Sequence, residues 1–89
     1  MPARRFRIHG RVQGVGFRMF TFDAAVREGL TGWVRNREDG GVEIVAEGGA
    51  ESLERFERAV RHGPPRARVE QVAVEIVLPS GDFLDFSVR

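Results

Sequence analysis

Two kinds of periodicity alternate along this chain, and their order leaves few possible folds. In some stretches apolar side chains recur at every second residue, which is typical of a strand with one face on a core and one in water. In others they recur with the spacing of an amphipathic helix. The alternating stretches predict strands over residues 5–12, 31–37, 42–47, 68–78 and 83–89. The helical stretches predict helices over residues 17–28 and 51–62.

The same periodicity predicts which side chains face the core. In the strands this set is Phe6, Ile8, Gly10, Val12, Gly32, Val34, Asn36, Val42, Ile44, Ala46, Val72, Val74, Ile76, Leu78, Leu84, Phe86 and Val88. In the helices it is Phe17, Phe20, Ala24, Leu53, Phe56 and Val60. Glu43 and Glu47 have the opposite parity and are expected on the outer, solvated face of their strand. Gly29 is expected to end the first helix in a left-handed conformation, and Asp39-Gly40 predicts a hairpin turn.

The order of these elements predicts the layers. Each strand–helix–strand unit crosses over in the right-handed sense, which puts both helices on one face of a mainly antiparallel sheet. The expected fold is therefore α+β: a ferredoxin-like β-α-β-β-α-β sandwich with a short fifth strand at the C-terminus. At 89 residues the chain is expected to form one domain, residues 1–89. This architecture serves many functions, so the fold alone assigns none.

Composition excludes several kinds of chemistry. The chain has no cysteine, which excludes disulfides, thiolate zinc sites and a cysteine nucleophile. All 14 basic residues are arginine, so no lysine can serve a Walker-type phosphate loop or a Schiff base. Against 13 acidic residues the net charge is +1, far from the cationic excess of a general nucleic-acid binder. No apolar run has the length of a membrane span, and no secretory signal is recognisable, so a cytoplasmic location is expected.

The segment between the first strand and the first helix, Gly10-Arg11-Val12-Gln13-Gly14-Val15-Gly16-Phe17-Arg18, is the most informative. Its paired glycines allow positive φ and close approach of a ligand to the main chain. Because the turn leads into a helix N-terminus, several of its N–H groups lack carbonyl partners and can bind an anion. Arg18 adds a planar, permanently charged fork that suits a phosphate. A plain tight turn, with Arg18 in solvent, is the alternative interpretation.

Other phosphate and nucleotide motifs fit this segment poorly. The RNA-recognition modules share the expected fold. Their aromatic motif, aligned with residues 13–20, is matched by the two glycines and by Phe17 and Phe20. Gln13, Val15 and Arg18 do not match it, and the glycines here interrupt a strand, whereas the RNA motif lies within one. The dinucleotide pattern fails on the spacing of its glycines.

The segment 10–18, followed by Gly-Trp-Val-Arg-Asn-Arg-Glu-Asp-Gly-Gly-Val-Glu at 32–43, resembles the two signatures of the acylphosphatases. Ala24-Ala25, Gly29-Leu30, Gly63-Pro64 and the pair Ala67 and Val69 are also similar to that family. The resemblance covers essentially the whole chain, with both motifs in order and correctly separated.

The resemblance implies a hydrolase that splits the carboxyl–phosphate anhydride of acylphosphates into a carboxylate and inorganic phosphate, with no cofactor and no metal ion. It implies that Arg18 and the main-chain amides of the loop hold the phosphoryl group; the loop residues are Gln13, Gly14, Val15, Gly16, Phe17 and Arg18. It also implies that Asn36 positions the attacking water. The expected partners are the small acylphosphate and its phosphate product, with no nucleic acid, no membrane and a monomeric chain.

The other polar groups have simpler expected roles. Arg5, Arg7, His9 and Arg11 form an outward stripe, and cross-strand pairing with Glu43, Glu47 and Glu75 is favoured over a polyanion surface. No cluster of acidic and histidine residues has metal-ligand spacing. Two alternatives remain: a non-catalytic ferredoxin-like module that binds a small anion or RNA, and an accessory acyl- or carbamoyl-phosphate domain of a larger enzyme. The length of the sequence favours the free-standing enzyme over the second.

Overall fold

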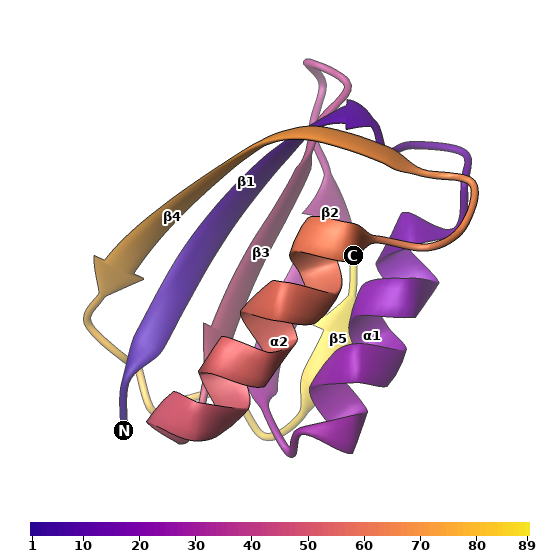
Figure 1. Ribbon diagram of the computed structural model, residues 1–89. Coiled ribbons are helices and arrows are strands. Elements are labelled where there is room, and N and C mark those ends of the chain that lie inside the picture. The colour runs from indigo at the N-terminus through magenta and orange to yellow at the C-terminus, as the bar shows by residue number, and fades with distance from the viewer.

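The computed structural model describes residues 1–89 as a five-stranded sheet with two helices on one of its faces (Figure 1). The strands are β1 (Ala3–Arg11), β2 (Thr31–Asn36), β3 (Val42–Glu47), β4 (Arg68–Val77) and β5 (Phe86–Val88). The helices are α1 (Phe17–Arg27) and α2 (Ala50–His62). Neither helix is long and apolar enough to cross a bilayer. The predicted order of elements is confirmed, and most boundaries fall within a residue or two of the predicted ones.

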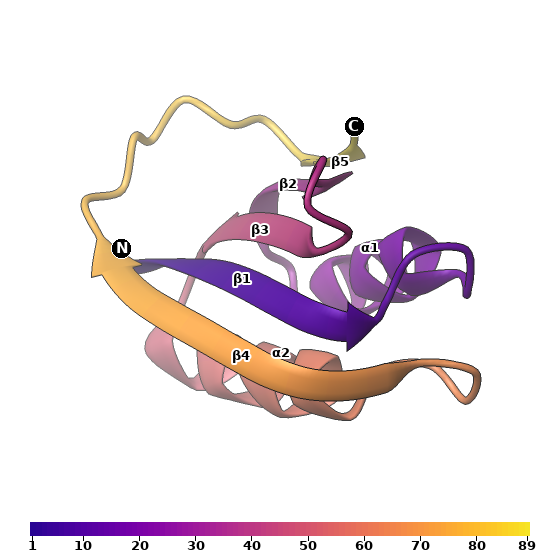
Figure 2. The ribbon, with the colours of Figure 1, turned by 90° about the horizontal axis from the view of Figure 1, so that it is seen from above.

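The strands lie in the order β4-β1-β3-β2-β5. Every neighbouring pair is antiparallel except β2 and β5, which run parallel. The chain therefore leaves the sheet at one edge, after β4, and returns to it at the other, along residues 78–85 (Figure 2). This arrangement confirms the ferredoxin-like expectation. It also makes β1 and β2 the two neighbours of β3. Because both run antiparallel to β3, the last residues of β2 and the loop after β1 lie at the same end of the sheet.

The core fills the space between the sheet and the helices. It is one cluster of 16 buried residues drawn from strands, helices and the loop after β1. Phe6 of β1 meets Phe56 of α2 edge to face, with ring centroids 5.6 Å apart, and Phe56 meets Phe86 of β5 at 6.2 Å. Burying a side chain of this size contributes about 1.5–3 kcal/mol. These aromatic contacts therefore join the interior strand β1 and the edge strand β5 to α2.

Five positions predicted to face the core are exposed: Asn36 and Val88, which end β2 and β5, and Ile76, Leu78 and Leu84. Ile76, Leu78 and Leu84 are almost fully exposed. The far end of β4, an edge strand, reaches beyond the helices, as Figure 1 shows, so nothing covers its apolar face there. Leu84 belongs to the connecting segment, because β5 begins only at Phe86. Alternation at the edge of a sheet is not enough to bury a side chain.

The expectation that Glu43 and Glu47 are solvated on the outer face of β3 is also wrong, because both residues are buried. As the central strand, β3 is overlaid by long side chains from both neighbours. The Glu47 carboxylate accepts hydrogen bonds from the main-chain N–H groups of Ser80 (2.7 Å) and Gly81 (3.1 Å). Burial alone would raise the pKa of Glu47, but these hydrogen bonds outweigh it and leave the pKa lowered. Glu47 thus holds the connecting segment against the end of the sheet.

Candidate active site

The turn between β1 and α1 presents a row of free main-chain amides. Gly14 and Gly16 have φ of 75° and 80°, in the left-handed region that favours glycine, and α1 begins at the next residue. No main-chain N–H from Gln13 to Met19 donates to another group of the protein. The positive end of the helix dipole lies at the same place. Free amides and the dipole together make this turn suitable for an anion.

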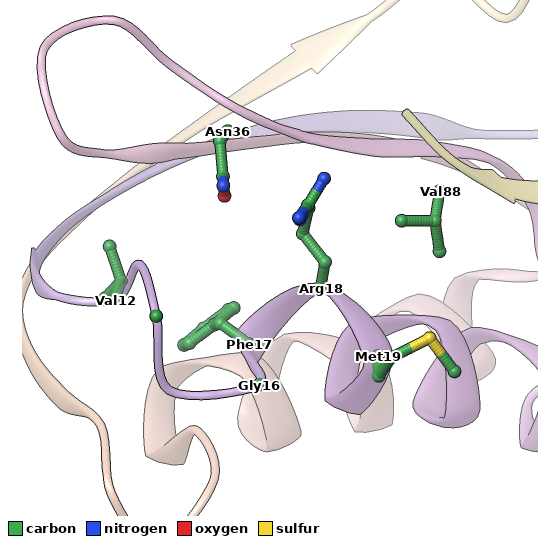
Figure 3. A pocket seen from close by; sticks show the side chains of 8 residues that line it. Val12, Gly16, Phe17, Arg18, Met19, Asn36 and Val88 are labelled. Carbon is green, nitrogen blue, oxygen red and sulfur yellow. The ribbon is translucent and has the colours of Figure 1, made fainter.

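Arg18 lies in the first turn of α1, and its side chain crosses toward the sheet (Figure 3). Its Nη1 donates to the main-chain oxygen of Arg89 at 3.0 Å. The chain at Arg89 is itself held, since its N–H donates to the carbonyl of Val34 in β2 at 2.8 Å. One Nη group of the guanidinium is therefore held by the residue that follows β5. The other N–H groups of Arg18 remain able to bind a ligand.

Asn36 is the last residue of β2, where it pairs with Val42 of β3. It shares parity with Val34, which is buried beneath the helices, so the Asn36 side chain points to the helix-covered side of the sheet. That direction brings it to the turn after β1, and its amide makes no hydrogen bond within the protein (Figure 3). Without a partner in the chain, the amide is free to donate to and accept from a water or ligand.

These groups line one cavity of about 280 Å³. Its walls are Val12, Gly14, Gly16, Phe17, Arg18, Met19, Asn36 and Val88. The structure thus places five of the predicted site residues in one pocket: Gly14, Gly16, Phe17, Arg18 and Asn36. The sequence missed Val12, Met19 and Val88; the signal available for Met19 was its position beside Arg18.

The other two residues of the predicted loop do not line the pocket. Val15 turns into the core. Gln13 turns toward the β2–β3 hairpin, where its Nε2 donates to the carbonyls of Arg37 (2.8 Å) and Gly41 (2.9 Å). Its side chain therefore ties the glycine turn to the segment that directly follows Asn36.

The hairpin after Asn36 is ordered by Asp39. The Asp39 carboxylate accepts from the N–H of Gly41 at 2.9 Å and contacts His9 and Arg37. The main-chain hydrogen bond from Gly41, then the contact with His9, lower the pKa of Asp39 to about 2. The predicted Asp39-Gly40 turn is confirmed. His9 itself lies outside the cavity lining, on the open face of the sheet.

On that open face the arginines surround a single carboxylate. Glu43, with only 5% of its side chain exposed, contacts Arg35 at 2.7 Å, Arg5 and Arg37 at 3.5 Å, and Arg7 at 3.9 Å. Burial raises the pKa of Glu43, but the hydrogen bonds and charges of these arginines lower it by more. Arg7 also meets Glu75 at 2.8 Å. The expected cross-strand pairing of Arg5 and Arg7 is confirmed; Glu47 instead binds the connecting segment.

No three His, Asp or Glu side chains lie close enough together to hold a metal ion. The pocket presents main-chain N–H groups, one guanidinium and one carboxamide. Such a set neutralises negative charge and orients a polar ligand.

Comparison with known proteins identifies the family. A family model described as Acylphosphatase matches residues 4–88. The chain belongs to the acylphosphatase family. It is 46% identical to the acylphosphatase of Syntrophotalea carbinolica over 96% of this chain and 92% of that protein. It is 46% identical to the acylphosphatase of Pasteurella multocida over 100% and 99%. The resemblance seen in the sequence motifs is thereby confirmed.

Solved structures agree with this assignment. The acylphosphatase of Bacillus subtilis matches with a TM-score of 0.96 and 42% identity, over 100% of this chain and 99% of that one. Full-length HypF, in a phosphate- and nucleotide-bound form, matches with a TM-score of 0.88 and 33% identity, over 99% of this chain but 12% of HypF. The acylphosphatase-family fold therefore also occurs as a small part of a much longer protein.

Proposed function

We propose that this acylphosphatase-family enzyme hydrolyses the carboxyl–phosphate anhydride of acylphosphates by direct attack of a positioned water, without a metal ion or a covalent intermediate. One observation carries the proposal. The partnerless amides of Gly14 and of residues 16–19, the anchored guanidinium of Arg18 and the free carboxamide of Asn36 all belong to residues that line a single cavity. We propose that residues 1–89 act as one catalytic domain.

The glycine turn and Arg18 hold the phosphoryl group in this mechanism. Phosphoryl transfer passes through a loose transition state whose charge is spread over the equatorial oxygens, so catalysis is mainly positioning and electrostatic stabilisation. Fixed amides and a guanidinium stabilise that charge without reorganising. Because Arg89 already fixes one side of Arg18, the guanidinium keeps its orientation as the substrate arrives.

Asn36 holds the attacking water. Its amide accepts one hydrogen bond from the water and orients the oxygen lone pair toward phosphorus. The new bond forms between the water oxygen and phosphorus while the bond between phosphorus and the bridging oxygen breaks, and the electron pair leaves with the carboxylate. One water proton passes to a phosphate oxygen. A doubly charged acylphosphate thus gives one carboxylate and one dihydrogen phosphate, and the weakly basic leaving group needs no protein acid.

Two substitutions test these roles. We expect Arg18→Gln to lower kcat/KM for acetyl phosphate by about 10²–10³, the usual effect of losing one such donor, and to weaken inhibition by inorganic phosphate. Asn36→Ala should lower kcat while leaving that inhibition largely unchanged. Arg27→Gln, at the exposed other end of α1, is the matched control. Equal loss of phosphate inhibition in both site variants would place Asn36 in the phosphate site and contradict its assignment to water. Activity that disappears with a chelator would overturn the metal-free mechanism.

The likeness to a segment of HypF favours a second candidate, an accessory domain that binds a phosphorylated group for a larger assembly. The isolated 89-residue chain separates the two: turnover of acetyl phosphate supports the enzyme, and phosphate binding without turnover supports the accessory domain. The monomeric state and the cytoplasmic location stay predictions, which sedimentation and cell fractionation would test.

A further inference from the structure

One end of the active-site cavity is apolar and open to solvent. Met19 is 56% exposed and Val88 is 39% exposed, yet both line the cavity that contains Arg18. The other large, strongly exposed apolar side chains lie elsewhere, at Met1, Val26, Ile76, Leu78 and Leu84. Ligand sites typically combine a few polar groups with apolar walls that contact the rest of the ligand. Met19 and Val88 are therefore positioned to contact the part of a substrate that the polar groups do not hold.

The in-line geometry of phosphoryl transfer also directs the acyl group toward Met19 and Val88. In Figure 3, Asn36 lies to one side of the Arg18 side chain, and Met19 and Val88 lie to the other. The attacking and leaving oxygens of a phosphoryl transfer are roughly in line through phosphorus. With the water at Asn36 and the phosphoryl group at the glycine turn and Arg18, the acyl group leaves away from Asn36, toward the apolar end of the cavity.

The charge beside that end also favours uncharged acyl groups. Asp23 lies four residues after Met19 on α1, so the two share a helix face. Asp23 is exposed and forms no ion pair with the protein. Its free carboxylate would repel an acyl group that carries a second negative charge.

We infer that Met19 and Val88 form an acyl-binding surface, and that the preferred substrates are acylphosphates with an apolar, aromatic or branched acyl group. The inference rests on the proposed function and adds the class of substrate. Contact of an apolar group with a hydrophobic pocket is worth about 10-fold or more in kcat/KM per group. Because these side chains are partly exposed, the expected effect lies at the low end of that range.

The kinetic experiment compares the ratio of kcat/KM for benzoyl phosphate to that for acetyl phosphate. We expect Met19→Ser and Val88→Thr each to lower this ratio by about 10-fold, and Met19→Leu to leave it close to the wild-type value. Val26→Ser is the control, because Val26 is equally exposed (57%) on the same helix but lies outside the cavity lining. Asp23→Asn should raise the turnover of succinyl phosphate relative to acetyl phosphate. A ratio unchanged in both Met19→Ser and Val88→Thr would overturn the inference.

A binding experiment separates this inference from the proposed reaction. Benzylphosphonate and methylphosphonate cannot be hydrolysed, and their dissociation constants can be measured by calorimetry on the whole chain. We expect benzylphosphonate to bind more tightly, and Met19→Ser to remove most of that difference. If acylphosphates are not turned over but the difference is present, the acyl surface stands and the proposed function fails. Equal binding of the two phosphonates overturns the acyl surface whatever the activity.

Discussion

Replacing Gln13 with leucine should remove the link between the two parts of the active site, the glycine turn with Arg18 and the end of β2 with Asn36. Each part should keep its own geometry. Leucine has a similar size but removes the Nε2 donor that reaches the carbonyls of Arg37 and Gly41. Each carbonyl keeps one main-chain donor, the N–H of Gly40 at 3.2 Å for Arg37 and the N–H of Arg37 at 2.8 Å for Gly41. A net hydrogen bond is worth about 0.5–1.5 kcal/mol, so losing two, with neither acceptor left bare, should lower the free energy of unfolding by about 1–2 kcal/mol.

The effect on catalysis should be larger than the effect on phosphate binding. The glycine turn and Arg18 keep their own geometry in Gln13→Leu, so inorganic phosphate should inhibit almost as well as before. The distance between the turn and Asn36, however, is no longer fixed by the Gln13 bridge. A misplacement of about 1 Å can cost about 10²-fold, so we expect kcat to fall about 10- to 100-fold.

Urea unfolding, steady-state hydrolysis of acetyl phosphate and inhibition by inorganic phosphate together measure these effects. Gln71→Leu is the matched control, because Gln71 is the other glutamine of the chain and is exposed on β4. Gln13→Glu should be worse than Gln13→Leu, since a carboxylate would face two carbonyl oxygens. If Gln13→Leu keeps both its unfolding midpoint and its kcat, the bridge contributes nothing to the site and this reasoning is wrong.

Two further predictions concern stability. The lowered pKa of Glu43 means that its contribution is present above its ordinary pKa of 4.5 and is lost as the pH falls through the lower folded-state pKa. The urea midpoint of the wild-type chain should therefore fall more steeply in acid than that of Glu43→Gln, and parallel pH profiles would contradict this. Gly32→Ala should cost at least about 2 kcal/mol, because φ is +136° and the new Cβ would overlap the carbonyl oxygen of Val45. Gly29→Ala, at φ +69° in open space, should cost only about 1 kcal/mol in the same urea titration.

The sequence predicted the interior strands better than the edges. In β1 and β3 the alternating apolar residues are buried as expected, because strands lie on both sides and helices cover the inner face. At Ile76 and Leu84 the same alternation failed. The alternation of a strand determines which face of the sheet a side chain points to. Whether that side chain is buried depends on whether a helix covers the sheet at that position.

The burial of Glu43 shows the same limit for polar residues. Parity correctly placed it on the face opposite the core. Its burial depends on four arginine side chains that reach it from β1, from β2 and from the hairpin, and no local pattern encodes how far such long side chains extend over a central strand.

By itself, the sequence determined what is local: the strand and helix periods, the glycines that allow the turn after β1, the arginine that follows it, and the family signatures. Only the tertiary structure decided which distant groups meet. Sheet order brings Asn36 to the glycine turn, directs Gln13 to the hairpin, and sets Val88 of the last strand beside Met19 of the first helix. The physical reason is that backbone conformation depends on neighbouring residues, whereas a pocket depends on contacts between elements, which form only when the whole core packs.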